Sequence, residues 1–130
     1  MTELTAVPSL DRVGQIAINV RDVKRATAFY RDVLGLKFLF AAPPGLAFFD
    51  CGGVRLMLTT PESAEHASMS SLVYYVVPDV PEAHRALSER GVVFEEIPHI
   101  VARMEGIELW MASMKDSEGN LLALMCEKKV

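Results

Sequence analysis

The side chains with the most capacity for chemistry gather around one histidine, in the stretch IPHIVARMEG. The imidazole of His99 can act as a general base or can donate a hydrogen bond to a ligand, and Arg103 and Glu105 follow it closely. The alternative is an exposed loop histidine with no such role. The stretch therefore offers one candidate acid/base group, placed between two segments that have the pattern of strands.

Three further side chains are of types that hold small molecules. Arg55 lies among apolar residues, where a guanidinium would pair with an anion, either a ligand carboxylate or a nearby glutamate. The alternative is an arginine at the rim of a sheet. Tyr74 and Trp110 can stack on a planar ligand, or can equally be aromatic residues of the core.

Other catalytic or metal-binding motifs are absent from the sequence. No local Ser/His/Asp or Cys/His arrangement indicates a nucleophile, and no close Cys or His pair indicates zinc. Cys51 and Cys126 lie beside or within predicted strands, so we expect two semi-buried free thiols. His66, in a polar linker, and His84, on a predicted helix, are expected to be solvated.

The composition indicates one domain and excludes several classes of partner. The chain has 130 residues, 51% of them hydrophobic, and a net charge of −4 without a basic stripe, so no nucleic acid is expected. No basic amphipathic helix points to a membrane surface. Residues 1–12 lack the pattern of a signal peptide, and we expect a flexible lead-in and a cytoplasmic protein.

The elements that would position these residues occur twice. Asp22 and Asp79 stand where helices begin, 57 residues apart, and Gly35 and Gly91 stand where they end, 56 residues apart. Each helix follows one strand and precedes further strand-like runs. The repeat predicts two βαβββ modules within one domain of residues 13–127, namely module one (13–60), a linker (61–70) and module two (71–127).

The second module is predicted to end in three strands: Val92–Ile97, Ile107–Met114 and Leu121–Cys126. Two such modules side by side predict an α+β fold with a curved, cup-shaped mixed sheet and helices on its convex face. Alternation along the strands assigns residues to that face: Ile16, Ile18, Val20, Leu56, Leu58, Tyr75, Val77, Leu122 and Leu124. It assigns others to the concave face: Gln15, Ala17, Asn19, Arg55, Met57, Thr59, Leu72, Tyr74, Leu121, Ala123 and Met125.

Three segments resemble the vicinal oxygen chelate superfamily, which includes glyoxalase I, bleomycin-resistance proteins and extradiol dioxygenases. They are VRDVKRATAFYRDVLGLKF (20–38), VPDVPEAHRALSERGVVF (77–94) and KDSEGNLLAL (115–124). The resemblance extends from about Val13 to Glu127 and implies the same cup-shaped fold. It also implies a homodimer in which the partner chain completes the cup.

Enzymes of that superfamily hold one divalent metal in the cup, and the resemblance places its four ligand positions at Gln15, Met57, Leu72 and Ala123. Divalent metals need carboxylate, imidazole or thiolate donors. Leu72 and Ala123 have no lone pair, Met57 offers a soft thioether, and Gln15 offers one neutral amide oxygen. We therefore expect no metal or other cofactor, and no reaction that depends on a metal as Lewis acid.

These expectations favour a metal-independent protein that binds a small apolar or aromatic molecule in the cup. The bleomycin-resistance proteins are the precedent within the resemblance for binding without catalysis. The predicted ligand contacts are Gln15, Asn19, Arg55, Met57, Tyr74, His99 and Trp110.

Two alternatives remain open. One is an enzyme of lyase, isomerase or dioxygenase type that uses His99 as acid/base, or a metal at a shifted site built from His99, Glu105, Glu108 or Gln15. The other is a cup filled by Leu72, Met57 and Met125, in which case the protein would act through surface contacts.

Overall fold

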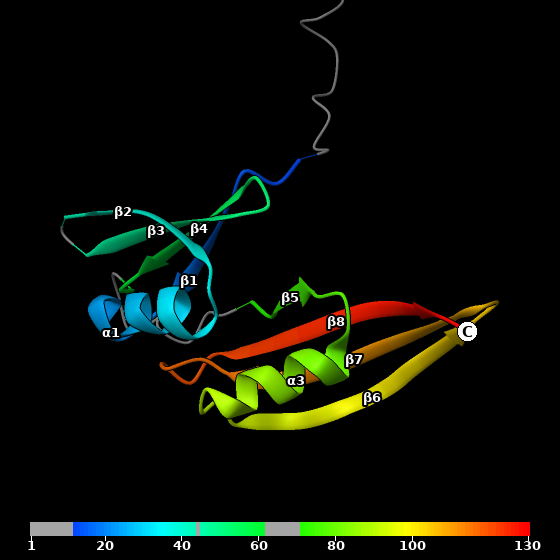
Figure 1. Cartoon of the computed structure of the whole chain (residues 1–130). Coiled ribbons are helices and arrows are strands. Elements are labelled where there is room, and N and C mark those ends of the chain that lie inside the picture. Colours follow the sequence, from blue (N-terminus) through cyan, green and yellow to red (C-terminus); the bar gives the residue numbers. More distant parts are fainter. Residues whose placement is uncertain (1–11, 44, 62–70) are drawn as a thin grey trace, which may run out of the picture.

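A computed structural model describes residues 12–43, 45–61 and 71–130 of the chain (Figure 1). Within these ranges the strands are β1 (Gln15–Asn19), β2 (Lys37–Ala42), β3 (Leu46–Cys51), β4 (Val54–Thr59), β5 (Val73–Val76), β6 (Phe94–Met104), β7 (Ile107–Lys115) and β8 (Leu121–Lys129). The helical elements are α1 (Val23–Ala28), a π-helical turn η2 (Phe29–Val33) and α3 (Val80–Glu89). Most of the predicted lead-in and linker, including His66, lies outside the described residues.

The strands form two four-stranded mixed sheets, ordered β1-β4-β3-β2 and β5-β8-β7-β6 in the described chain. In each sheet the first strand lies parallel to the last strand of its module, and the other pairs are antiparallel. The crossover between the parallel strands contains the helix, as parallel pairing requires. The predicted α+β fold of two tandem βαβββ modules is confirmed, with one sheet for each module.

The helices begin and end where the sequence predicts. The carboxylates of Asp22 and Asp79 each accept a hydrogen bond from the backbone N–H three residues further on, at 3.0 Å in both cases. Gly35 and Gly91 have φ angles of +76° and +92°, which glycine adopts without steric cost. No helix in the described ranges is long and apolar enough to cross a membrane.

One hydrophobic core joins the helix-covered faces of both sheets. Its buried members come from β1, α1, η2, β3 and β4 in module one and from α3, β7 and β8 in module two. All nine residues predicted for the convex face belong to this core or pack against it. Because both sheets bury their helix-covered faces in the same core, their other faces are left facing outward.

The turn between β7 and β8 also fastens the two modules together. The side chain of Glu118 is only 1% exposed, and its carboxylate accepts hydrogen bonds from Arg25 Nε at 2.7 Å and Nη2 at 2.9 Å. It also accepts the backbone N–H groups of Arg21 and Asp22, at 3.0 and 2.9 Å. These bonds lower the pKa of Glu118 to about 2, and the hydrogen bonds from Arg25 have the largest effect.

Two neighbours of Glu118 add to the same connection. The buried hydroxyl of Tyr30 donates to Asp116 Oδ2 at 2.7 Å, and Asn120 Nδ2 donates to the backbone oxygen of Asn19 at 2.9 Å. The turn thus bonds to α1, η2 and β1 of module one. It holds the modules in place as well as reversing the chain.

One strand is longer than predicted. The sequence suggests a strand that stops at Ile97 and a loop that contains His99, but β6 continues to Met104. Register shifts lie on both sides of Glu96 and between Ile100 and Ala102. Because β6 is an edge strand, these bulges accommodate Pro98, which has no N–H to donate to a ladder. His99 therefore lies on a strand.

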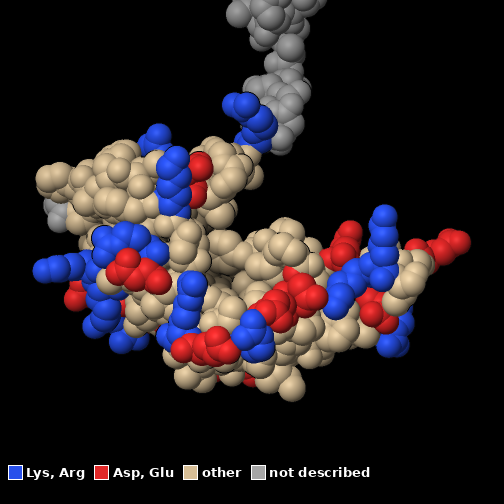
Figure 2. Space-filling model, in the orientation of Figure 1, with Lys and Arg blue, Asp and Glu red and all other residues tan. Residues whose placement is uncertain are grey.

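The two modules carry opposite net charges. Residues 12–60 contain seven Lys and Arg against three Asp and Glu, and residues 71–130 contain six against ten, which gives +4 and −4. Figure 2 shows one face of the molecule, where basic side chains gather around α1 and acidic side chains alternate with basic ones over module two. This asymmetry bears on how two copies would meet.

Candidate functional site

Each sheet has one face that no helix covers, which we call its open face. On sheet one the register places Gln15, Ala17 and Asn19 beside Arg55, Met57 and Thr59 on this face. Four predicted contacts, namely Gln15, Asn19, Arg55 and Met57, therefore lie together on two adjacent strands. The amide Nε2 of Gln15 lies 3.7 Å from the sulfur of Met57, in position to donate a weak hydrogen bond.

An aromatic row extends this group across the sheet. The guanidinium carbon of Arg55 lies 5.4 Å from the centroid of the Phe48 ring. Phe48 in turn stacks on Phe40, with 4.7 Å between centroids and 29° between ring planes. The open face of sheet one thus presents a cation, two rings, an amide and a thioether side by side, a combination that suits a planar organic ligand.

Phe40 and Phe48 are absent from the predicted contacts. Strict alternation from Phe38, which lies on the core side, would send Phe40 to the same side. A register shift between Phe38 and Phe40 instead turns Phe40 to the open face, opposite Phe48. No signal in the sequence marks this bulge.

Sheet two places two more predicted contacts, Tyr74 and His99, on its own open face. Tyr74 lies opposite Ala123, and His99 lies opposite Met111, which is itself paired with Met125. His99 Nδ1 lies 2.8 Å from the backbone oxygen of Ile97. Since a carbonyl oxygen can only accept, Nδ1 carries the hydrogen and a neutral ring keeps its Nε2 lone pair for another partner.

Trp110 lies apart from these residues. It is paired with Cys126 and packs against the core, on the opposite face of β7 from Met111. Its Nε1 donates to Glu108 Oε1 at 3.4 Å, and Lys128 Nζ lies 5.5 Å from its ring centroid. Trp110 therefore does not join the other predicted contacts on the open face of sheet two.

The residues that the resemblance assigns to the metal positions do not fit a divalent metal. Gln15 and Met57 belong to sheet one, Leu72 lies directly before β5, and Ala123 is buried on β8. This set offers one amide oxygen and one thioether, and lacks the carboxylate or imidazole that such metals require.

The residues considered for a shifted metal site do not converge either. His99 lies on the open face of sheet two, whereas Glu108 pairs with Arg103 at 3.3 Å on the other face. Glu105 is exposed in the turn between β6 and β7. The described residues contain no group of three or more His, Cys, Asp or Glu placed to hold a metal ion.

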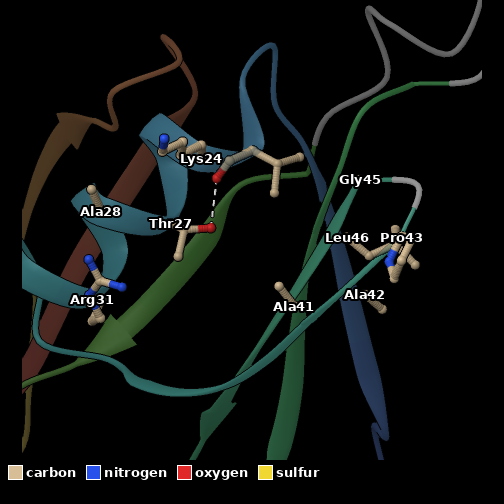
Figure 3. Close-up of a pocket in the computed structure, with 10 residues that line it drawn as sticks. Lys24, Thr27, Ala28, Arg31, Ala41, Ala42, Pro43, Gly45 and Leu46 are labelled. Carbon is tan, nitrogen blue, oxygen red and sulfur yellow. Dashed lines mark hydrogen bonds between the residues drawn. The ribbon is translucent and has the colours of Figure 1, made fainter.

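A groove of about 610 Å³ lies away from the open faces, between α1 and the end of the β2–β3 hairpin (Figure 3). Its walls are mostly small and apolar, and Lys24 and Arg31 stand on the helix side. Thr27 donates its hydroxyl to the backbone oxygen of Val23 at 2.6 Å, and Arg31 is paired with Asp32. None of the predicted ligand contacts lines this groove.

Comparison with known proteins agrees with this architecture. The sequence profile of the Glyoxalase/Bleomycin resistance protein/Dioxygenase superfamily matches residues 12–124. A lactoylglutathione lyase from Agrobacterium tumefaciens is 23% identical with a TM-score of 0.72, over 91% of this chain and 95% of that one. No curated protein sequence matches the chain significantly.

Two other solved structures show the same fold. A superfamily member from Sphaerobacter thermophilus DSM 20745 is 22% identical with a TM-score of 0.74, over 89% of this chain and 97% of that one. TnmS3, an antibiotic binding protein from Streptomyces sp. CB03234, is 22% identical with a TM-score of 0.72, over 91% and 97%. Since the profile spans most of the sequence, the chain belongs to the glyoxalase/bleomycin resistance protein/dioxygenase superfamily.

Proposed function

We propose that the chain is a metal-independent small-molecule binding protein that holds an apolar or aromatic ligand against the open faces of its sheets. The observation that carries the proposal is the pairing of two features on those faces. The usual metal positions hold residues that cannot form a metal site, while Arg55, Phe40 and Phe48 form a surface suited to an organic ligand. The similarity in fold to an antibiotic binding protein is consistent with binding without catalysis.

The same faces support a homodimer as part of this proposal. The candidate contacts are divided between the two sheets, and each sheet keeps β1 or β5 as an edge strand. Large apolar side chains are exposed on the open faces, among them Phe40, Tyr74 and Val76. Exposed apolar surface of this kind marks an interaction site. A second copy that apposes its module two to module one of the first would cover both faces and enclose the ligand between them.

The charges of the modules favour this arrangement. A two-fold axis brings each surface of one copy against the complementary surface of the other. Residues 12–60 carry a net charge of +4 and residues 71–130 a net charge of −4, so apposing unlike modules brings opposite net charges together twice in the dimer. Apposing like modules would place equal charges together, which opposes association.

The geometry of His99 specifically supports the enzyme alternative. Because the Nδ1–H of His99 is fixed by Ile97, a neutral ring offers Nε2 as a proton acceptor on the open face of sheet two. The similarity in fold to a lactoylglutathione lyase is consistent with an enzyme. A cytoplasmic location stays a prediction.

Ligand binding is expected to raise the melting temperature equally with and without metal. A screen of metabolites and antibiotics by thermal shift would be run in a chelator and again with Mn²⁺, Ni²⁺ or Zn²⁺. Ligands that bind the folded state stabilise it by mass action. Hits that appear only when metal is added would contradict metal independence.

Replacing His99 by alanine separates binding from catalysis. As a ligand contact, His99 contributes about one hydrogen bond, so H99A is expected to weaken a hit several-fold, by roughly 1 kcal/mol. The measurement is the dissociation constant of wild type and variant, with mass spectrometry of the ligand after incubation. Conversion of the ligand by wild type but not by H99A would favour the enzyme alternative.

A further inference from the structure

We propose that the ligand is an aromatic carboxylate, whose carboxylate pairs with Arg55 and whose ring stacks on Phe40. The inference rests on the proposed function and names the class of molecule that its site accepts. Arg55 supplies the charge, and the exposed ring of Phe40, beyond Phe48 in the same row, supplies the stacking surface.

Arg55 is held in place without being neutralised. Its guanidinium lies over the ring of Phe48, and such contact leaves the N–H groups in its plane free to bind a carboxylate through two parallel bonds. Among the described residues it has no ion pair and no side-chain hydrogen bond. Asp50 is opposite Arg55 in the register but accepts the backbone N–H of Gly53, at 3.2 Å.

The two phenylalanines have different roles in this surface. Phe48 is only 8% exposed, because it lies between Arg55 and Phe40. Phe40, at the outer end of the row, is 45% exposed and offers its ring to an incoming aromatic group. Since Phe48 separates Arg55 from Phe40, by 5.4 Å from the guanidinium carbon and 4.7 Å between ring centroids, the spacing suits an extended ring system with an anionic group at one end.

The balance of charge favours a monoanion over a phosphate. The other cation on this open face, Lys37, is separated from Arg55 by the intervening Asp50 in the cross-strand register. One guanidinium therefore faces the ligand, and a dianion would keep part of its charge uncompensated in an apolar setting. Lys37, Asp50 and Arg55 together carry a net charge of +1, which a single carboxylate matches.

The test compares 2-naphthoate with 2-naphthamide, which has nearly the same shape but no charge. Each would be titrated into the full chain, with binding followed by chemical-shift changes in NMR spectra. Naphthoate is expected to bind about tenfold or more tightly than the amide, since hydrogen bonds to charged groups exceed neutral ones in strength. Octanoate, which has the carboxylate but no ring, is expected to bind more weakly than naphthoate.

Three variants separate the contribution of the Arg55 charge from that of the Phe40 ring. R55Q is expected to remove the preference for naphthoate and leave the affinity for the amide unchanged. K37Q removes the same charge from the same open face and is expected to keep the preference. F40A is expected to weaken naphthoate and naphthamide by a similar factor, several-fold in each case.

The outcomes distinguish this inference from the proposed function. Equal binding of naphthoate and naphthamide by wild type would overturn the aromatic carboxylate and leave small-molecule binding standing. An R55Q protein that keeps the preference would overturn the role of Arg55. Loss of the dimer in R55Q, measured by sedimentation, would show that Arg55 pairs with the partner copy and would also overturn it. Failure of every probe, together with no hit in the thermal-shift screen, would reject the proposed function itself.

Discussion

Replacing Glu118 by glutamine is expected to lower the free energy of unfolding by about 3 kcal/mol, because a nearly buried carboxylate that joins the two modules loses its charge. The carboxylate accepts two bonds from Arg25 and two from backbone N–H groups at the start of α1. Glutamine keeps the shape but brings an NH₂ group to positions that require an acceptor. Urea denaturation of wild type and E118Q measures the difference.

The same residue predicts an acid dependence of stability. The pKa of Glu118 falls from 4.5 to about 2 on folding. A lowered folded-state pKa means that the carboxylate stabilises the protein fully above pH 4.5, and that this contribution declines as the pH falls towards 2. Wild type should therefore lose more stability than E118Q over that interval.

A matched control exists on the surface. Glu82 pairs with Arg85, but its side chain is 62% exposed and both partners lie on α3. E82Q is expected to change the free energy of unfolding by less than about 1 kcal/mol. An E118Q protein as stable as E82Q would contradict the role of the β7–β8 turn in joining the modules.

Replacing Val76 by aspartate is expected to abolish the proposed dimer while the monomer stays folded. Val76 is 77% exposed on the open face of sheet two, so the change costs little in a single chain. In the dimer the new aspartate would be buried against the second copy as an unpaired charge, which costs several kcal/mol. The dissociation constant of the dimer is therefore expected to rise at least about a hundredfold. Analytical ultracentrifugation over a range of concentrations measures this constant.

Val93 provides the control for that experiment. It is 73% exposed and lies between α3 and β6, away from the open faces. V93D makes the same chemical change and is expected to leave the dimer intact. Equal dissociation of V76D and V93D, or a wild type that stays monomeric, would contradict the proposed arrangement.

Much of the fold was predictable because its signals are local and repeated. The Asp caps, the stop glycines and the alternation along β1, β4, β5 and β8 fix the helices and the two faces of each sheet. The same alternation places Gln15, Arg55 and Tyr74 on the open faces. The sequence does not decide on which face of β7 Trp110 lies. The pairing of β7 with β6 contains bulges, and an aromatic residue suits either face of the strand.

Features that depend on tertiary contacts were not predictable. The bulge that turns Phe40 to the open face has no sequence marker, and Pro98 resembles the end of a strand although β6 passes through it. The role of Glu118 cannot be predicted from the neighbouring sequence, since its partners lie more than ninety residues away in the chain. Turn composition predicts the reversal of the chain but not what the side chains of the turn bind.

The β7–β8 turn and the strand after it have separate roles. Asp116, Glu118 and Asn120 bind module one and so preserve the architecture. Ala123, three residues further on, provides a methyl group at a position that the resemblance to the superfamily's enzymes assigns to a metal ligand. Since different residues serve the two purposes, the proposed absence of a metal is compatible with the scaffold of this superfamily.

The most direct test of metal independence is the metal content of the purified protein. The full chain would be produced in medium supplemented with Mn²⁺, Fe²⁺, Ni²⁺ and Zn²⁺, dialysed without a chelator, and analysed by inductively coupled plasma mass spectrometry. A donor set of one amide and one thioether predicts far less than one ion per chain for every metal. One ion of a single metal per chain, retained through dialysis, would contradict the account.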